Sequence, residues 1–287
     1  MRFASISGKF MKVWSQSSRL VLKNMQDHVA FLHGLLTNDI RSMGNMSVSY
    51  NLWLKTNGSV RSDFYVYRID EAFYLFGEFE ESLKEEFLKL RMSLKVEFEV
   101  LNWELAFVEG ADFGFECGTF DGLFVFRNPI RFGIEGYDVF GEKEKLREFL
   151  KGQEIDTREL ELIRIQNLIP AVGKELIEKI SPIEACMIPR AISLTKGCYV
   201  GQEAIARVYY RGKPQRVLAK IRAKGLKKGQ KILSDSFEAG FVTSALEDLG
   251  LGFILRKALN SELKTDCGEK VIIEKLCDER GVSQETA

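Results

Sequence analysis

The sequence is poor in the residues that usually build metal sites and disulfide frameworks. It has only two histidines, His28 and His33, and five cysteines among 287 residues. The histidines lie five positions apart in an apolar helical pattern, whereas metal-binding pairs on a helix favour a spacing of four, so we expect them to have packing or surface roles. The cysteines are odd in number, scattered and without a Cys-x-x-Cys pair. This pattern argues against both a disulfide framework and a zinc site.

Net charge and long apolar runs are also absent. Lys and Arg total 41, and so do Asp and Glu, so the formal net charge is zero. Such a chain lacks the overall positive field that attracts nucleic acid or anionic lipid, and we expect neither as a partner. No window approaches the roughly 18 apolar residues of a membrane span. The first residues, MRFASISGKFMKVW, lack the apolar core of a signal peptide, so we expect a cytoplasmic protein.

The chain is nevertheless rich enough in apolar residues to bury a substantial core. Hydrophobic residues make up 45% of it, and its length favours two or three domains. Asp27 is expected to cap a helix that ends near residues 37–39. The Asn57-Gly58 dipeptide accepts the positive φ angles of a tight turn, which predicts a hairpin. Apolar periodicity predicts further helices over 80–94, 141–151 and 156–167, and strands over 96–108, 113–116 and 122–127.

The pattern changes after Lys213-Pro214. Short β-type runs separated by turn residues predict a small β-barrel or sandwich. The last ten residues, DERGVSQETA, have almost no apolar content and are expected to fray. The sequence as a whole therefore predicts α+β structure followed by a small all-β domain.

One cysteine lies in an unusually polar, turn-prone segment, LTKGCYVGQEAIARVYYRGKPQR (194–216). Buried structural cysteines are usually surrounded by apolar residues, where the thiol is inert. Cys198 instead follows Lys196, whose charge favours the reactive thiolate, and two glycines allow the backbone to turn around it. The alternative is an ordinary surface turn. Arg207 likewise has two readings, a ligand contact or an ion pair with Glu203 four residues earlier on a helix.

This segment resembles the signature of the YgfZ family of folate-binding proteins, which are relatives of the aminomethyltransferase (T-protein) of the glycine cleavage system. The motif residues are Lys196, Gly197, Cys198, Tyr199, Gly201, Gln202, Glu203 and Arg207. The resemblance extends to FLHGLLTNDI, to the hairpin NLWLKTNGSVRSDFYVYR, to RFGIEGYDVF and to AGFVTSA, and covers roughly residues 20–260.

The resemblance implies an α+β, GcvT-like fold, with two α+β subdomains and a small C-terminal β-barrel around a central cleft. On this basis we expect a folate-binding region over 1–212, the barrel over 213–280 and a tail over 281–287.

Two positions depart from the relatives. The aminomethyltransferases carry adjacent acids in the hairpin strand, one of them needed for catalysis, whereas this chain has Ser62-Asp63. A glutamate that usually grips the pterin is replaced by Gln166, which can accept and donate hydrogen bonds but supplies no charge. The resemblance thus implies Asp63 and Gln166 as folate ligands. The alternatives are that Asp63 pairs across the hairpin and that Gln166 caps the backbone.

The resemblance implies a tetrahydrofolate-binding accessory protein for iron–sulfur cluster assembly or repair, with Cys198 as the reactive residue. A thiolate suits iron and sulfur chemistry, and a transient cluster would require a partner's ligands. Support for iron–sulfur enzymes that thiolate tRNA would be indirect. The alternatives are a folate-dependent one-carbon transferase, which would depend on Asp63, and a tRNA-binding module using Arg207, Arg211, Lys213 and Arg216. We do not expect a true aminomethyltransferase or a resident metal site.

Overall fold

The structure is a computed structural model that describes residues 9–14, 19–22, 27–77, 81–150, 157–210, 212, 214–235 and 237–277. Its internal contacts divide the chain into two compact units. Unit 1 comprises Met1–Trp53 and Ser62–Leu160, and unit 2 comprises Leu54–Arg61 and Glu161–Ala287. No helix in the described ranges is long and apolar enough to cross a membrane.

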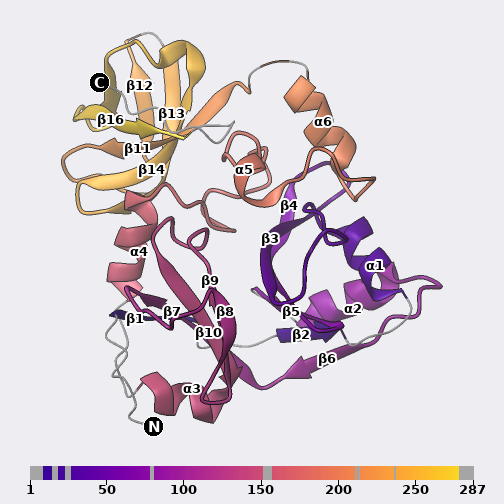
Figure 1. Ribbon diagram of the computed structural model, residues 1–287. Coiled ribbons are helices and arrows are strands. Elements are labelled where there is room, and N and C mark those ends of the chain that lie inside the picture. Colours follow the sequence, from indigo (N-terminus) through magenta and orange to yellow (C-terminus); the bar gives the residue numbers. More distant parts are fainter. Residues whose placement is uncertain are drawn as a thin grey trace. The chain divides into compact units, whose positions relative to one another are not determined.

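In its described residues, unit 1 has two antiparallel five-stranded sheets, three complete helices and the first residues of Thr157–Gln166 (α4) (Figure 1). The strand orders are β1-β7-β10-β9-β8 and β3-β4-β5-β2-β6. The strands of the first sheet are Lys9–Trp14 (β1), Trp103–Glu109 (β7), Cys117–Phe120 (β8), Leu123–Arg127 (β9) and Gly136–Glu142 (β10). Those of the second are Arg19–Leu22 (β2), Ser47–Leu54 (β3), Val60–Ile69 (β4), Ala72–Phe76 (β5) and Phe98–Leu101 (β6). The helices are His28–Leu35 (α1), Glu81–Leu90 (α2) and Lys143–Leu150 (α3).

Aromatic side chains hold the two sheets of unit 1 together. Tyr67 of β4 is fully buried, and its ring centroid lies 5.1 Å from Phe126 of β9 and 4.5 Å from Phe140 of β10. Large side chains that alternate along a strand fill the space between packed sheets. One part of the core of this unit therefore lies between its two sheets, and another part packs Leu146 and Leu150 of Lys143–Leu150 (α3) against strands of the first sheet.

The predicted helices and hairpin of unit 1 are present, but two details of the prediction are wrong. Asp27 occupies the N-cap position of α1 without capping it, because its carboxylate instead accepts a hydrogen bond from the backbone N–H of Lys95 at 2.8 Å. The strand predicted over 113–116 lies at 117–120 (β8). Asp121 and Gly122 both have positive φ and form the tight turn into β9, which places the strand directly before them.

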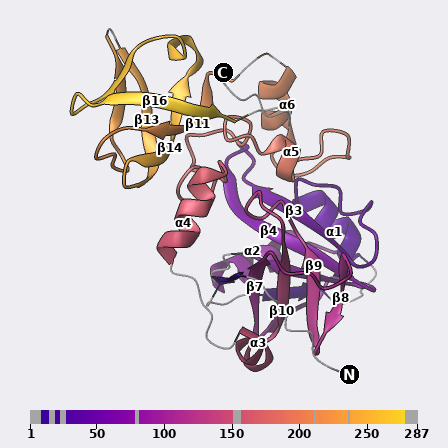
Figure 2. The ribbon, with the colours of Figure 1, turned by 60° about the vertical axis from the view of Figure 1, so that its left-hand side comes forward.

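The predicted β-structure of unit 2 is a closed barrel with the order β11-β14-β13-β12-β15-β16 (Figure 1). Figure 2 shows β11, β13, β14 and β16 from a second direction. The strands are Arg216–Arg222 (β11), Lys231–Ser234 (β12), Phe237–Leu246 (β13), Leu249–Leu255 (β14), Leu263–Thr265 (β15) and Lys270–Leu276 (β16). Closure leaves no unpaired sheet edge, and side chains such as Ile221, Ile232 and Ile254 fill the interior.

Short helices precede the barrel. They are Ile188–Ala191 (α5), Gln202–Tyr210 (α6) and the part of Thr157–Gln166 (α4) that belongs to unit 2. The 3-10 helix Arg256–Ala258 (η1) follows β14. Asp156, the predicted cap of α4, and the predicted frayed tail lie outside the described residues.

The cysteine pattern led to a wrong prediction for one pair. Cys186 and Cys277 form a disulfide across a sequence separation of 91 residues. The backbone of β11 brings them together, because the N–H of Leu218 donates to the carbonyl of Glu184 and the N–H of Cys277 donates to the carbonyl of Leu218. Such a pair cannot be found from spacing, since only the tertiary fold makes the two segments neighbours.

Candidate functional site

The signature loop, residues 193–201, exposes Cys198 directly before α6. The side chains on either side of this thiol are anchored. Lys196 is only 7% exposed, and its backbone N–H donates to the hydroxyl of Ser193 at 3.2 Å. Its side-chain ammonium lies 4.9 Å from the ring centroid of Tyr199. Tyr199 is also buried, which raises the pKa of its phenol to about 12. A buried cation over an aromatic ring stiffens the loop while leaving the sulfur accessible.

Within unit 2, two glycines allow the tip of the β3–β4 hairpin to pack closely against this loop and the start of α6. Gly201 has a φ of +81°, and a Cβ there would lie 2.6 Å from the carbonyl oxygen of Lys55. Gly58, the predicted turn glycine, has a φ of +82°, and its Cβ would lie 2.6 Å from the Cβ of Ala204. Both positions therefore need glycine for backbone conformation and for space. The hairpin tip and the start of α6 form one packed surface.

The remaining motif residues begin α6 and are accessible. Gln202 is partly exposed, whereas Glu203 and Arg207 are exposed. The segment is helical, as the ion-pair alternative requires, yet no ion pair joins Glu203 to Arg207 among the side chains that the structure describes. Arg211 and Lys213 lie outside the described residues.

A cavity of about 360 Å³ borders α6, and a second of about 150 Å³ adjoins it. The first is lined by Ser181, Glu184, Arg207, Val208, Gly212, Pro214 and Gln215. The second is lined by Asn57, Gly58, Ser59, Glu178, Lys179, Ile180, Ser181, Ala204, Ile205 and Val208. Cys198 lines neither of them, so the thiol and these cavities are separate features of the segment.

Asp63 lies on β4 in unit 1 and is held by a tyrosine that the sequence did not single out. The hydroxyl of Tyr50 donates a 2.6 Å hydrogen bond to its Oδ2. The rings of Tyr50 and Tyr65 stack at 4.4 Å, and the guanidinium of Arg131 lies 3.8 Å from the centroid of Tyr65. Asp63 thus does pair across the hairpin, and the same bond fixes the direction in which its partly exposed carboxylate points.

Arg131 is itself fixed by a buried ion pair with Asp138 of β10. The hydroxyl of Tyr67 donates to Asp138 at 2.6 Å, and the amide of Asn128 also donates to it. Burial alone would lower the pKa of Arg131, but Asp138 outweighs it and the pKa is raised. Burial and the charge of Asp138 raise the pKa of Tyr67 well above its ordinary value. The charged pair is supported by hydrogen bonds from Tyr67 and Asn128, which a buried ion pair needs to offset its desolvation.

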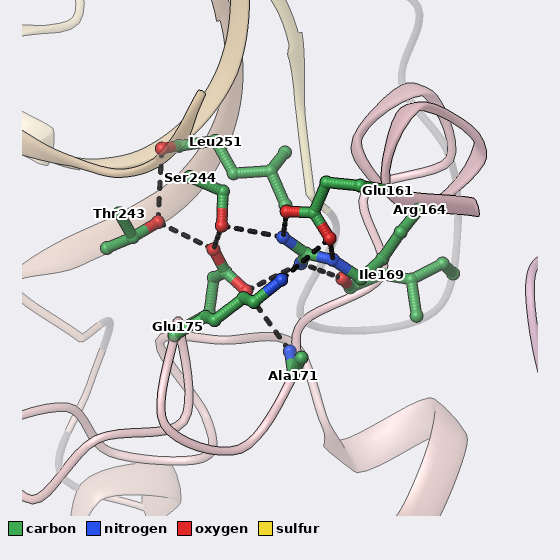
Figure 3. Close-up of polar contacts among 9 residues, drawn as sticks. Glu161, Arg164, Ile169, Ala171, Glu175, Thr243, Ser244 and Leu251 are labelled. Atoms are coloured by element: carbon green, nitrogen blue, oxygen red, sulfur yellow. Dashed lines mark hydrogen bonds and ion pairs between the residues drawn. The ribbon is translucent and has the colours of Figure 1, made fainter. Parts of the chain in front are cut away.

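Gln166 ends α4 and is exposed, so its amide is available to a ligand. Two residues earlier, Arg164 enters the buried network drawn in Figure 3. Its guanidinium donates to Glu175 at 2.7 Å, to Ser244 at 2.6 Å and to the carbonyl of Ile169 at 2.7 Å. Glu175 also accepts from Thr243, Ser244 and the N–H of Ala171. The network ties the end of α4 to β13 and so holds Gln166 relative to the barrel.

Glu161 completes this network from the preceding turn of α4. It accepts hydrogen bonds from Arg164 at 2.6 Å and from Lys174 at 2.7 Å. Partial burial opposes its ionisation, but these two cations outweigh burial and lower its pKa to about 2. The sequence offered one signal for the network, the polar pair Thr243-Ser244 between the apolar residues Val242 and Ala245, but their partner Glu175 is 68 positions away from Thr243.

The two histidines lie in α1 and are buried. His28 packs against Phe73 with ring centroids 5.5 Å apart, and Nδ1 of His33 lies 3.2 Å from the carboxylate of Asp39. Within the described ranges, no group of three or more His, Cys, Asp or Glu side chains is placed to hold a metal ion.

The predicted site residues therefore fall into two sets. The motif residues form one loop–helix segment of unit 2. Gln166 also belongs to unit 2 but lies on α4, whereas Asp63 belongs to unit 1. Their roles in binding and chemistry stay predictions.

Comparison with known proteins gives relatives in sequence and in fold. No protein-family model matches the chain. An uncharacterized protein of Aquifex aeolicus is 36% identical over 135 residues, which is 42% of this chain and 91% of that protein. An aminomethyltransferase of Caldanaerobacter subterraneus subsp. tengcongensis is 22% identical over 267 residues, covering 80% of this chain and 71% of that enzyme.

A solved structure has the same fold. The crystal structure of the glycine cleavage system aminomethyltransferase T from Bartonella henselae superposes with a TM-score of 0.76 at 15% identity, covering 88% of this chain and 81% of that one. The predicted α+β fold with a C-terminal barrel is thereby confirmed.

Proposed function

Because the chain belongs to the same family as the Aquifex protein and is related to the aminomethyltransferases, we propose that it binds tetrahydrofolate and assists iron–sulfur cluster assembly or repair through Cys198. Tetrahydrofolate supplies a ring nitrogen that accepts a one-carbon unit. The protein's own contribution is to bind and orient the pterin and to present a thiol.

The exposure of Cys198 in an anchored loop is the observation that carries this proposal. A thiol that served only to fill space would lie among apolar side chains. Here Lys196 and Tyr199 are buried on either side, while the sulfur faces solvent. One thiolate can supply one ligand to iron, and because clusters need several, the proposal includes a partner protein. Maturation of iron–sulfur enzymes that thiolate tRNA is an indirect consequence.

A matched pair of cysteine variants tests this role. Cys198 and Cys267 are both exposed and free of disulfides. In cells that lack the protein, Cys198→Ser should fail to restore iron–sulfur enzyme activity, whereas Cys267→Ser should restore it fully. Both purified variants should still bind tetrahydrofolate. Full rescue by Cys198→Ser would overturn the proposal.

Gln166 of unit 2 and Asp63 of unit 1 are the folate ligands that the sequence predicts, and each is tested by itself. An exposed amide or an oriented carboxylate can each bond to the nitrogen-rich edge of a pterin. Gln166→Glu restores a charge, so calorimetric titration should show about tenfold tighter tetrahydrofolate binding. Asn260→Asp adds the same charge at an exposed barrel position and should leave the affinity unchanged. Unchanged affinity in Gln166→Glu would remove Gln166 from the site.

The bond between Tyr50 and Asp63 favours a second candidate, a folate-dependent one-carbon transferase. A carboxylate held at 2.6 Å by a tyrosine is positioned to orient a reacting nitrogen. The purified protein would then move a methylene group from an aminomethyl donor to tetrahydrofolate, and Asp63→Asn would abolish this transfer while Cys198→Ser would not. No transfer by the wild-type protein would exclude this candidate.

A further inference from the structure

The two adjoining cavities beside α6 form a second feature of unit 2, separate from the exposed thiol. They share Ser181 and Val208 in their linings, so the two cavities are direct neighbours. A volume of about 360 Å³ is within the range of small-ligand pockets, whereas about 150 Å³ is too small by itself. We call the two cavities together the recess; Arg207 lines its larger part and Lys179 its smaller part.

The charge of this recess is not balanced. Arg207 and Lys179 are both exposed, and neither has an ion-pair or hydrogen-bond partner among the described residues. A pair of unneutralised cations along one recess creates a local positive potential, although the whole chain has no net charge.

The two carboxylates that line the recess do not cancel this potential, because each already has a partner. Glu184 is buried and accepts hydrogen bonds from the N–H groups of Ser181 at 3.1 Å and Arg216 at 3.2 Å, with the Arg216 guanidinium 3.7 Å away. Glu178 is 3.3 Å from the ammonium of Lys55. Counting these partners, the described residues leave one positive charge in each part of the recess, from Arg207 and from Lys179.

We propose that this recess binds a small, elongated anion with an acidic group at each end, one facing Arg207 and the other Lys179. The ligand's acidic groups are carboxylates or phosphates, since both accept charge-assisted hydrogen bonds from guanidinium and ammonium groups. Val208 supplies an apolar wall at the junction, and Gln215 and Ser181 supply further polar groups. This site lies beyond the proposed thiol and pterin functions, because Cys198, Asp63 and Gln166 do not line it.

Calorimetric titration with two probes tests the proposal and separates the two chemistries. Tri-γ-glutamate represents carboxylates and tripolyphosphate represents phosphates. We expect one of them to bind, and Arg207→Gln and Lys179→Gln each to weaken it about tenfold. Lys228→Gln removes an exposed charge from a barrel turn that does not line the recess, and it should have no effect.

A steric variant separates the recess from its charges. Val208→Phe fills the junction without changing any charge, and it should also abolish binding while leaving the melting temperature within a few degrees of the wild type. Absence of binding by both probes would overturn the proposal. So would equal weakening by Lys228→Gln and Arg207→Gln, because that result would indicate attraction to surface charge alone.

Discussion

The hydroxyl of Tyr50 donates a 2.6 Å hydrogen bond to Oδ2 of Asp63 across the β3–β4 hairpin. The tyrosine is 5% exposed and stacked on Tyr65, so its position is fixed by packing and the carboxylate takes its orientation from it. A buried phenol thus holds the acid of the Ser62-Asp63 pair in the β3–β4 hairpin.

Removing this phenol should cost both stability and binding. Tyr50→Phe keeps the ring stack but deletes a hydrogen bond to a charged group, and we expect a loss of about 1–2 kcal/mol in the free energy of unfolding by urea. Tetrahydrofolate affinity should fall as well, because the variant loses the bond that orients the proposed ligand Asp63. Tyr210→Phe changes an exposed tyrosine and should alter stability by less than about 0.5 kcal/mol.

Acid should weaken unit 2 through Glu161. Its pKa is about 2 in the folded protein and near 4.5 in the unfolded chain, so the folded state favours the charged form. The resulting stabilisation is fully present above pH 4.5 and is lost as the pH falls toward 2. It is worth on the order of 2–3 kcal/mol.

Glu161→Gln should therefore unfold more easily than wild type at pH 6, and the difference should shrink as the pH falls toward 2. Urea titrations at several pH values measure this. Glu262→Gln, an exposed barrel position, should follow the wild-type curve. Parallel curves for wild type and Glu161→Gln would contradict the assignment.

The disulfide should stabilise the oxidised protein. Because it closes a loop of 91 residues, its loss in the double variant Cys186→Ser, Cys277→Ser should lower stability by about 2–4 kcal/mol. A thiol reductant should lower the melting temperature of the wild type but not that of the double variant. Peptide mapping without reductant should recover the linked pair, and two free thiols at these positions would refute it.

Glycine is required where the hairpin tip meets the signature loop. Gly201→Ala and Gly58→Ala each place a Cβ within 2.6 Å of another atom at a positive φ, and we expect each to destabilise the protein by about 2 kcal/mol or more. Gly44→Ala meets no atom within 4 Å and should be tolerated. Thermal unfolding by circular dichroism distinguishes these outcomes.

Local chemistry made much of the fold predictable. Asn57-Gly58 marked the hairpin because few other dipeptides accept its backbone angles, and apolar periodicity located α1, α2 and α3. Prediction was weaker where turn geometry competed with β-propensity. The strand expected at 113–116 lies at 117–120 because Asp121-Gly122, not the residues before it, forms the turn.

The candidate site was only partly predictable for the same reason. The signature segment is contiguous, so its motif and exposed cysteine could be read directly from the residues. Tyr50 and Glu175 could not be predicted from the sequence. Tyr50 donates a hydrogen bond to Asp63, 13 positions away, and Glu175 accepts one from Thr243, 68 positions away. Spacing along the chain carries no information about such partners.

The sequence by itself determined the helices of unit 1, the β3–β4 hairpin, the β-structure after Pro214 and the polar loop that carries Cys198, because each depends on neighbours within a few residues. Only the tertiary structure decided that Cys186 bonds Cys277, that Tyr50 contacts Asp63 and that Arg207 and Lys179 line adjoining cavities. These depend on contacts between distant segments, and such contacts form only when burial of the apolar core brings the segments together.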